Sequence, residues 1–290
     1  MSIDIGLIGQ LDTAVAAEAS ELMRVAFKMA PDFGAHNIMR TTVSPIADKS
    51  AIAFAARDGD RLVGFNAFIP FALRKGAERA IAYQSCWSAT HPDYQGRGIW
   101  ASVMNQAKSM LTDEALFICG LPNPNSHPIM VRKLGYREVS VVHSLIPAVP
   151  GLASRWLRTR RLRTPTGWVP DEPAIAATKR LATDLIEIRS GTGYVWGKRV
   201  AGRWKRLPVT MLQVGGISIG EDPVCLGSLV DGLARSRASM IHIVLSASHE
   251  LAPALRNVKP MSGVRPFVVL DLQTEPTEPL NIMYGITDVF

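Results

Sequence analysis

The spacing of hydrophobic and polar positions predicts an alternation of strands and helices over residues 1–148. Between Thr13 and Met29, apolar side chains recur every three or four residues, which is typical of an amphipathic helix. Two later apolar runs are separated by Asp58-Gly59-Asp60, and Asp-Gly in this place favours a hairpin because glycine accepts the positive φ of a tight turn. The predicted elements are strands at 3–8, 50–57, 61–71, 79–90, 115–121 and 136–146, and helices at 13–29, 98–111 and 125–135.

A second series of alternating elements follows a Pro-rich, Arg-rich stretch. It consists of strand-like 207–214, helix-like 223–238, strand-like 239–246, a short helical 248–257 and strand-like 266–273. We therefore predict a first domain at 1–148, a basic linker at 149–173 and a second, smaller domain of related layout at 174–290. The fold class that follows is α/β with mixed layers, in which helices flank a mixed sheet.

Composition and charge narrow the class of protein. The 290 residues, 47% of them hydrophobic, are enough for a full core, and the net charge of +7 favours polyanionic partners such as nucleotide cofactors, nucleic acid or anionic lipid. The N-terminus shows no signal-peptide pattern, and no apolar run approaches the roughly 18 residues of a membrane span, so we expect a cytoplasmic protein. Three widely spaced cysteines, Cys86, Cys119 and Cys225, indicate neither a disulfide framework nor a metal site.

The stretch YQGRGIW, residues 94–100, carries the clearest chemical signal. Gly96 and Gly98 allow successive backbone amides to turn toward one ligand, and a helix that starts there adds its positive dipole end. A phosphate or pyrophosphate is the ligand that such a turn favours, although two glycines could also serve a plain strand-to-helix turn. A Walker loop needs GxxxxGK[ST], which is absent, and the turn does not follow a first strand as a Rossmann GxGxxG does.

The run THPDYQGRGIW resembles the acyl-CoA turn of the GNAT superfamily of N-acyltransferases, which reads [QR]-x-x-G-x-[GA] at the start of a helix. Gln95, Gly98 and Trp100 stand at the motif positions, and Trp100 departs from the small residue usual there. GLPNPNSHPIMVRKLGY (residues 120–136) and the C-terminal YGITDVF are similar to a subset that includes acyltransferases of polysaccharide gene clusters. YVWGKRV (residues 194–200) resembles tandem members with a degenerate second GNAT-like domain.

The resemblance implies that the co-substrate is acetyl-CoA or another acyl-CoA. It also implies that no metal is needed. In this superfamily the fourth and fifth strands splay apart, and the pantetheine arm pairs with the fourth strand, here at Ser88 and Thr90. Asn125 matches the asparagine that contacts the pantetheine amides, and it could equally be a helix N-cap. The resemblance therefore predicts that the co-substrate is bound by Ser88, Thr90, Gln95, Gly96, Arg97, Gly98, Ile99, Trp100 and Asn125.

The usual acid and base of the superfamily are both missing. Many members use a Glu on the fourth strand, but residues 81–90 contain no Asp, Glu or His, and Val131 stands where the tyrosine acid is expected. His127, one helical turn before Val131, is the best-placed substitute, because a histidine can exchange a proton near neutral pH. His127 could instead be a plain surface histidine. A bound water, or Asp271 or Asp288 of the second domain, would then exchange the proton.

These inferences predict an acyl-CoA-dependent N-acyltransferase acting on a small amine, which the subset resemblance makes an amino sugar, free or nucleotide-linked. The rivals are a CoA-binding module without turnover and a Fem-type aminoacyl transferase. Because the pyrophosphate turn is complete, we expect no nucleic-acid partner. The arginine run 155–163 is a solvated linker, a membrane-surface contact, or a contact to a nucleotide sugar or RNA.

Overall fold

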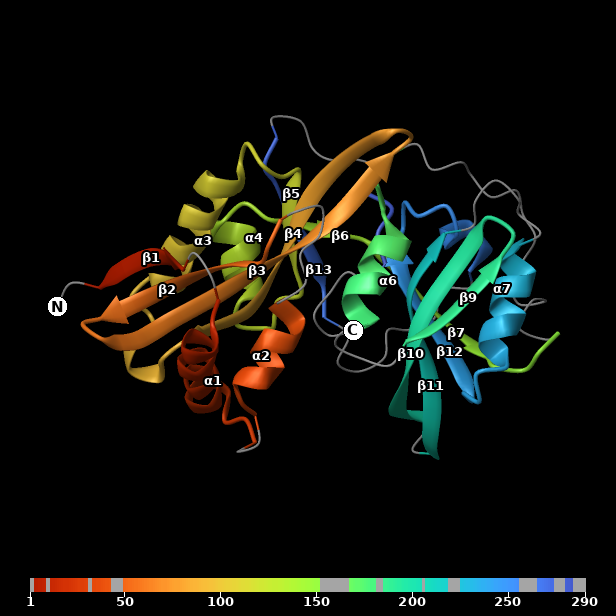
Figure 1. The fold of residues 1–290 in the computed structure, drawn as a ribbon, viewed down its shortest axis with the longest axis horizontal. Helices are drawn as coiled ribbons and strands as arrows, with labels where there is room; N and C mark the ends of the chain where they lie inside the picture. The colour runs from red at the N-terminus through yellow and green to blue at the C-terminus, as the bar shows by residue number, and fades with distance from the viewer. Residues whose placement is uncertain are drawn as a thin grey trace. The chain divides into compact units, whose positions relative to one another are not determined.

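In the computed structural model of the protein, the chain forms two compact units. Unit 1 comprises Met1–Ala72, Ala80–Glu138 and Phe267–Pro276, and unit 2 comprises Leu73–Arg79, Val139–Pro266 and Thr277–Phe290 (Figure 1). The structure describes residues 3–8, 11–30, 33–42, 49–151, 167–180, 185–204, 207–218, 225–255, 265–273 and 280–283. The basic run 155–163 lies outside the described residues.

Unit 1 contains a mixed sheet whose strands follow the order β1-β2-β3-β4-β5-β13-β6. Its strands are β1 (Asp4–Ile8), β2 (Ile52–Asp58), β3 (Arg61–Lys75), β4 (Glu78–Thr90), β5 (Phe117–Gly120), β6 (Arg137–Val139) and β13 (Phe267–Asp271). Its helices are α1 (Thr13–Phe27), α2 (Ala35–Thr42), the 3-10 turn η1 (Pro92–Tyr94), α3 (Ile99–Leu111) and α4 (His127–Lys133). The hairpin expected at Asp58–Asp60 joins β2 to β3, with Gly59 at a φ of +59°.

Helices cover both faces of this sheet. Apolar residues of α1 and α2 pack with one set of strand residues, and those of α3 and α4 pack with the other. The first residue of α3 lies close to β3, since a Cβ added at Gly64 would lie 2.8 Å from Ile99 Cγ2. Glycine at that position therefore sets how closely the start of α3 approaches the sheet.

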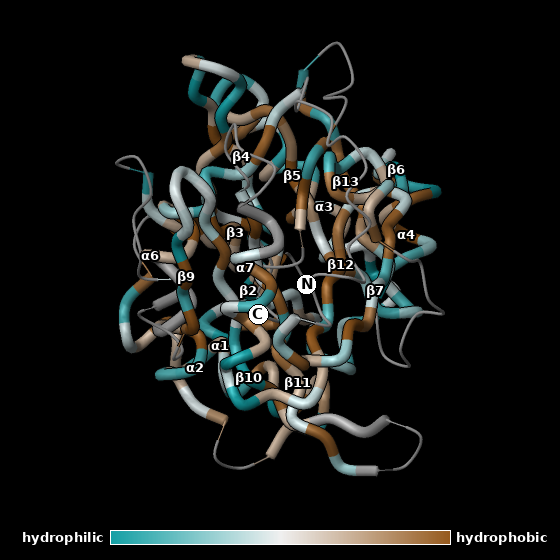
Figure 2. The backbone as a smooth tube through the Cα atoms, turned by 90° about the vertical axis from the view of Figure 1, so that its right-hand side faces the viewer, coloured by the Kyte–Doolittle hydropathy of each residue, from teal (hydrophilic) through white to brown (hydrophobic). Residues whose placement is uncertain are grey.

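Unit 2 contains a five-stranded sheet in the order β7-β12-β11-β10-β9. Its elements are β7 (Val141–Pro147), β8 (Val169–Pro170), α6 (Glu172–Arg180), β9 (Ile186–Ser190), β10 (Gly193–Trp204), β11 (Leu207–Ser218), α7 (Cys225–Ala234), β12 (Met240–Ser246) and the 3-10 turn η2 (Ala252–Ala254). β8 pairs with the end of β3, at Leu73 and Arg74. Figure 2 shows central strands such as β5 and β12 as largely hydrophobic, as expected for strands covered on both faces.

The two sheets share a strand plan. In each, three antiparallel strands lead through a helix to a parallel strand, which has an antiparallel neighbour on its far side: β2-β3-β4-α3-β5 with β13, and β9-β10-β11-α7-β12 with β7. The parallel pairs are also alike, because β11 and β12 pair only from Met211–Met240 to Gln213–His242. The related layout expected for the second half of the chain is thus visible in its topology.

The structure divides the chain differently from the expected boundaries. The strand expected at 136–146 is broken into β6, in the first sheet, and β7, in the second. β13, expected in the second domain, pairs with β5 from Val268–Gly120 to Asp271–Phe117. Apolar patterns indicate that a strand is buried but not which sheet holds it, and so each sheet contains a strand from the other half of the sequence.

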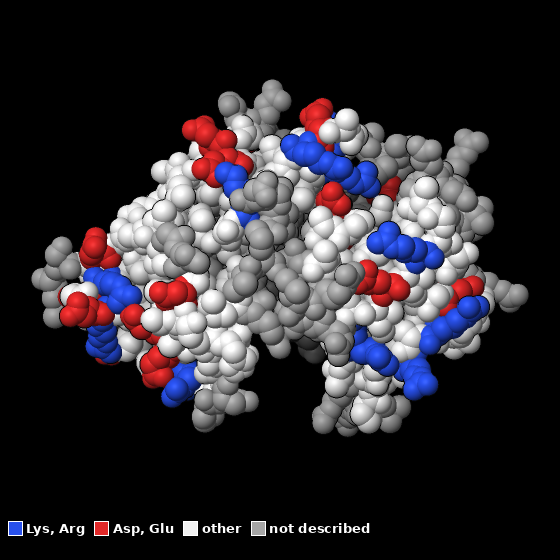
Figure 3. Space-filling model, in the orientation of Figure 1, with Lys and Arg blue, Asp and Glu red and all other residues white. Residues whose placement is uncertain are grey.

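Charged side chains of both signs lie on the face of the molecule that Figure 3 shows. Figure 3 shows acidic and basic side chains interspersed on the face in view, rather than gathered by sign. Among the described helices, none is long and apolar enough to cross a membrane.

Candidate active site

The glycine turn forms a tight connection between β4 and α3. Gly96 and Gly98 adopt φ angles of +78° and +76°, and a Cβ on either would meet no heavy atom within 4 Å. The turn therefore requires glycine for its backbone angles rather than for space. Gly98 is the N-cap of α3, whose 13 residues direct a positive dipole end at the turn. Backbone N–H groups at such a helix start can bind phosphate oxygens.

Side chains of the turn fasten it in place. Gln95 Nε2 donates to the carbonyl oxygen of Thr90 at 3.3 Å, which ties the turn to the end of β4. The Arg97 guanidinium lies 4.8 Å from the centre of the Tyr94 ring and donates to the Asp93 carbonyl oxygen at 3.0 Å. Arg97 thus contacts the turn itself, and its contact with the co-substrate stays a prediction.

β4 and β5 run parallel and pair over a short stretch at the middle of β4. Tyr83 lies opposite Ile118 and Gln84 opposite Cys119, and within the described residues the pairing stops there. β5 ends at Gly120, whereas β4 continues to Thr90. The second half of β4 is therefore not paired to β5, as the resemblance implied for the pantetheine arm.

β4 also contains an irregularity that the sequence pattern does not reveal. Trp87 has a φ of +51°, which is an outlier for a bulky residue. Side chains three apart in a regular strand point to opposite faces, yet Ser85 and Ser88 both contact Asn66. The left-handed residue thus acts as a β-bulge, which shifts the alternation by one and turns Ser88 toward the α3 face.

Asn66 joins β3, β4 and the first turn of α3. Its Nδ2 lies 3.1 Å from the Ala67 carbonyl oxygen and 3.2 Å from Ser85 Oγ. Its Oδ1 contacts Ser88 Oγ and lies 3.4 Å from Trp100 Nε1 and 3.3 Å from Ser85 Oγ. The structure therefore brings Ser88 and Trp100, both predicted site residues, to one buried amide. An asparagine within the apolar run LVGFNAFIP was the signal for Asn66, which sequence reasoning missed.

The turn after β5 is organised by Asn123 rather than by Asn125. Asn123 Oδ1 accepts hydrogen bonds from the backbone N–H groups of Asn125 and Ser126, both at 2.9 Å. Ser126 occupies the N-cap position of α4, but its side chain makes no capping bond. The Asn125 side chain is exposed, and its contact with pantetheine stays a prediction.

His127 is the first residue of α4, and its partner is an acidic residue of β6. Its Nε2 lies 2.8 Å from Glu138 Oε1, at ion-pair distance without hydrogen-bond geometry. No hydrogen bond or ion pair among the described residues joins His127 to Asn66 or Ser88. Asp271 belongs to the first sheet, where it binds Arg137 at 2.7 Å, and Asp288 lies outside the described residues.

In unit 2 the place where β11 and β12 stop pairing corresponds to the place where β4 and β5 stop pairing in unit 1. This strand parting of unit 2 is filled by the chain itself. Residues 280–283, at most 3% exposed, lie against the ends of β11 and β12. The Ile217 N–H donates to Met283 Sδ at 3.2 Å, and the Ser246 N–H donates to the Ile282 carbonyl oxygen at 2.9 Å. The Ile217 N–H, on the part of β11 that corresponds to the second half of β4, is therefore already hydrogen-bonded, as is the Ser246 N–H of β12.

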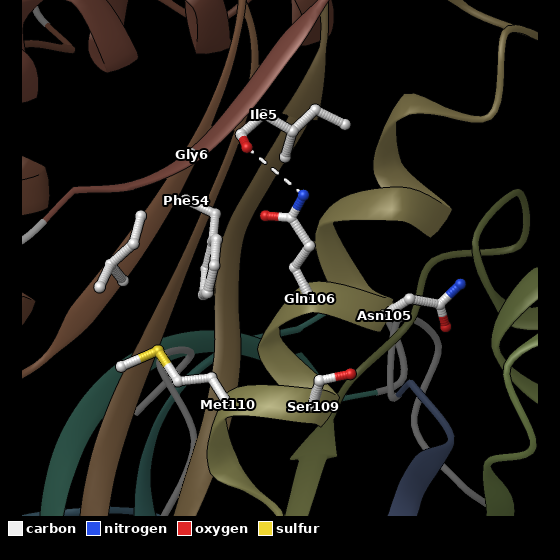
Figure 4. A pocket seen from close by; sticks show the side chains of 8 residues that line it. Ile5, Gly6, Phe54, Asn105, Gln106, Ser109 and Met110 are labelled. Atoms are coloured by element: carbon white, nitrogen blue, oxygen red, sulfur yellow. Dashed lines mark hydrogen bonds between the residues drawn. The ribbon is translucent and has the colours of Figure 1, made fainter.

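A groove of about 600 Å³ lies elsewhere on unit 1, between β1 and the middle of α3 (Figure 4). It is lined by Ile5, Gly6, Leu7, Phe54, Asn105, Gln106, Ser109 and Met110. Gln106 Nε2 donates to the Ile5 carbonyl oxygen at 3.3 Å across it. Because none of these residues belongs to the glycine turn or to β4, we do not assign the groove to the candidate site.

Comparisons with known proteins agree with this geometry. Residues 10–139 match the family model described as "Acetyltransferase (GNAT) domain". No curated protein matches the sequence significantly. A GCN5-related N-acetyltransferase from Kribbella flavida matches 93% of this chain and 72% of its own at 14% identity and a TM-score of 0.62.

Two further structures have the same fold. A GCN5-related N-acetyltransferase from Anabaena variabilis matches 93% of this chain and 73% of its own at 12% identity and a TM-score of 0.61. Eis1 from Mycobacterium abscessus matches 94% of this chain and 74% of its own at 12% identity and a TM-score of 0.57. At these identities the structures establish the fold, and the family model is similar to residues 10–139, which make up less than half of the chain.

Proposed function

We propose that this protein transfers an acyl group from acyl-CoA to an amine at unit 1. The observation that carries the proposal is the glycine turn, where Gly96 and Gly98 hold positive φ at the start of α3. This turn directly follows the half of β4 that is not paired to β5. The turn offers amides to the pyrophosphate, and the unpaired strand offers main-chain groups to the pantetheine arm.

The reaction needs a proton acceptor and a proton donor. The amine nitrogen attacks the thioester carbon, the C–S bond breaks, the amine gives up a proton and the leaving thiolate takes one up. We assign the exchange to His127. The support for this assignment is Glu138, whose Oε1 lies 2.8 Å from Nε2, so that its charge stabilises the imidazolium formed when Nδ1 takes up the proton.

The acceptor that we propose is a small amine, with amino sugars and their nucleotide-linked forms as the first to test. The resemblance of GLPNPNSHPIMVRKLGY to acyltransferases of polysaccharide gene clusters supports this choice. We further propose that the second unit is a degenerate GNAT-like domain, supported by its shared strand plan. The cytoplasm is the proposed location, because CoA thioesters are made there.

Gly98→Val tests the donor site. A β-branched residue resists the φ of +76° at position 98, so the amides of the turn lose their arrangement and we expect CoA binding to fall below detection in calorimetry. Gly6→Ala is the matched control, since a Cβ there meets nothing within 4 Å. Unchanged CoA affinity in a folded Gly98→Val protein would contradict the pyrophosphate assignment.

Turnover separates the proposed enzyme from its rivals. Thiol release from acetyl-CoA is measured with a panel of amines that contains glucosamine, UDP-glucosamine, spermidine and tyramine. Release with at least one amine supports the transferase. CoA binding without release on any amine favours a non-catalytic module, and aminoacyl transfer from charged tRNA without CoA binding favours the Fem-type reaction.

A further inference from the structure

The Asn66 amide uses all of its hydrogen-bonding capacity inside the protein. An asparagine offers two N–H donors and one oxygen with two lone pairs. The donors serve the Ala67 carbonyl oxygen and Ser85 Oγ, at 3.1 and 3.2 Å. The oxygen is contacted by Ser88 Oγ, by Trp100 Nε1 and, at 3.3 Å, by Ser85 Oγ. Asn66 is fully buried, at 0% exposure, so these contacts inside the protein decide how the amide is oriented.

Two of these partners permit only one orientation. An indole N–H can only donate, and a backbone carbonyl can only accept. Trp100 therefore requires the Asn66 oxygen on its side, and Ala67 requires the Asn66 nitrogen on its side. A flipped amide would set donor against donor at Trp100 and oxygen against oxygen at Ala67, and leaving buried groups unpaired in this way is costly.

The orientation of Asn66 decides what Ser88 can do. The Ser88 hydroxyl contacts Asn66 Oδ1, the oxygen that Trp100 also contacts. Because this oxygen cannot donate, the hydroxyl proton must point to it. A serine has one O–H, so Ser88 Oγ keeps only its lone pairs for a ligand. On the basis of the proposed function, we propose that Asn66 and Trp100 are positioning residues that fix Ser88 Oγ as the acceptor for an N–H group of a bound substrate.

This assignment names the chemistry that Ser88 recognises. The proposed reaction brings two kinds of N–H group to this region, the amides of the pantetheine arm and the attacking amine. A thioester or carbonyl oxygen would not be recognised, because Ser88 has no proton left to give it. The assignment also accounts for Trp100 where the GNAT motif has a small residue, since the indole N–H locks the amide.

The test compares Ser88→Ala, Trp100→Phe and the double variant. Phenylalanine keeps an aromatic ring but removes the N–H, so the Ala67 carbonyl oxygen alone still fixes the Asn66 amide and the polarity of Ser88 is held less tightly. We expect each single variant to lose about five- to tenfold in CoA affinity or in kcat/KM for the amine. We expect the double variant to lose no more than Ser88→Ala, because both changes act through one hydroxyl. Ser109→Ala, on the exposed side of α3, is the control.

The molecule that supplies the N–H group is identified by whether the CoA dissociation constant or kcat/KM changes. A weaker CoA dissociation constant in calorimetry indicates a pantetheine amide, and an unchanged constant with lower kcat/KM indicates the amine; both support the proposal. Losses that multiply in the double variant, or a loss with Ser88→Ala that Trp100→Phe does not share, overturn it.

Failure of the proposed function is distinguishable from failure of this inference. If the wild-type protein binds no CoA and shows no turnover, the proposed function is wrong. The orientation of the Asn66 amide is then tested by NMR, from the rate of hydrogen exchange of the Trp100 indole N–H. Slow exchange that becomes fast in Asn66→Leu supports the locked amide, and fast exchange in the wild-type protein overturns it.

Discussion

His127 is the single residue on which the proposed proton transfer depends. Residues 81–90 supply no Asp, Glu or His, and Val131 stands where the tyrosine acid of the superfamily is expected. The structure adds Glu138, whose carboxylate lies 2.8 Å from Nε2. A positioned acid or base contributes about 10²- to 10⁴-fold in rate, so we expect His127→Ala to lower kcat at least about 100-fold while CoA affinity is kept. Steady-state kinetics and calorimetry on the same preparation measure both.

Glu138→Gln is the matched variant for this prediction. Glutamine keeps the shape of the side chain and removes the charge that holds the imidazole, so we expect a smaller fall in kcat than for His127→Ala. If His127→Ala lowers kcat less than about tenfold, its contribution is under about 1.4 kcal/mol, and His127 then has no part in proton transfer.

At the scale of elements, β11 shows how a strand is adapted to a buried carboxyl group. A Cβ added at Gly216 would collide with the Glu172 carboxyl and the Trp196 indole, which are hydrogen-bonded to each other at 2.7 Å. We expect Gly216→Ala to lower the free energy of unfolding by at least about 2 kcal/mol, since overpacking a buried site costs this much. Denaturant unfolding measures the change, and Gly6→Ala, which meets open space, should differ from wild type by less than about 0.5 kcal/mol.

The elements predicted from the sequence are those with a clear period. The helix expected from Thr13 and the one that begins after Gly98 are both present, because apolar spacing reports directly on a buried face. α2 was missed, since AHNIMRTT has too few apolar residues to show a period.

The interior of the candidate site was less predictable than its motif. The glycine turn shows in the sequence because positive φ favours glycine, and the structure places it at the start of α3 as expected. The bulge of β4 rests on Trp87, a residue type that gives no sign of positive φ. Without the bulge, Ser85 and Ser88 would be assigned to opposite faces, and a contact of both serines with Asn66 would not be expected.

At the scale of the whole molecule, unit 2 carries buried groups that link its stability to pH. Burial raises the pKa of Glu172 to about 8 and that of Glu250 to about 7, from 4.5. The folded state then holds protons that the unfolded state has released, so stability falls as pH rises from about 4.5 to 8. Burial also lowers the pKa of His242 and of His249 to about 4, so stability also falls as pH drops from 6.5 toward 4.

These opposing effects predict how the melting temperature changes with pH. Between pH 4.5 and 6.5 they oppose each other, whereas above 6.5 only the carboxyl groups act. We expect the melting temperature to fall between pH 6.5 and 8, with Glu172 contributing at most about 2 kcal/mol over that interval. Glu172→Gln keeps an acceptor for the Trp196 N–H and should reduce the fall. An equal fall in wild type and Glu172→Gln would remove Glu172 as its cause.

The shared strand plan raises the question of how many acyl-CoA molecules one chain binds. In unit 1 the second half of β4 is not paired to β5, whereas in unit 2 the Ile217 N–H and the Ser246 N–H are already bonded to residues 280–283. A pantetheine arm would have to displace this buried segment and its hydrogen bonds, and leaving such groups unpaired is costly.

We therefore expect calorimetry to give one CoA per chain, and Gly98→Val to remove all binding rather than half of it. The reasoning is that the glycine turn belongs to unit 1 alone, since the sequence of unit 2 has no counterpart of QGRGIW. Met283→Ala is the complementary variant: it shortens the side chain that accepts the Ile217 N–H but supplies no glycine turn, so the stoichiometry should stay at one. A stoichiometry of two in the wild-type protein, or binding that persists at one site in Gly98→Val, would show that unit 2 binds CoA despite its filled strand parting.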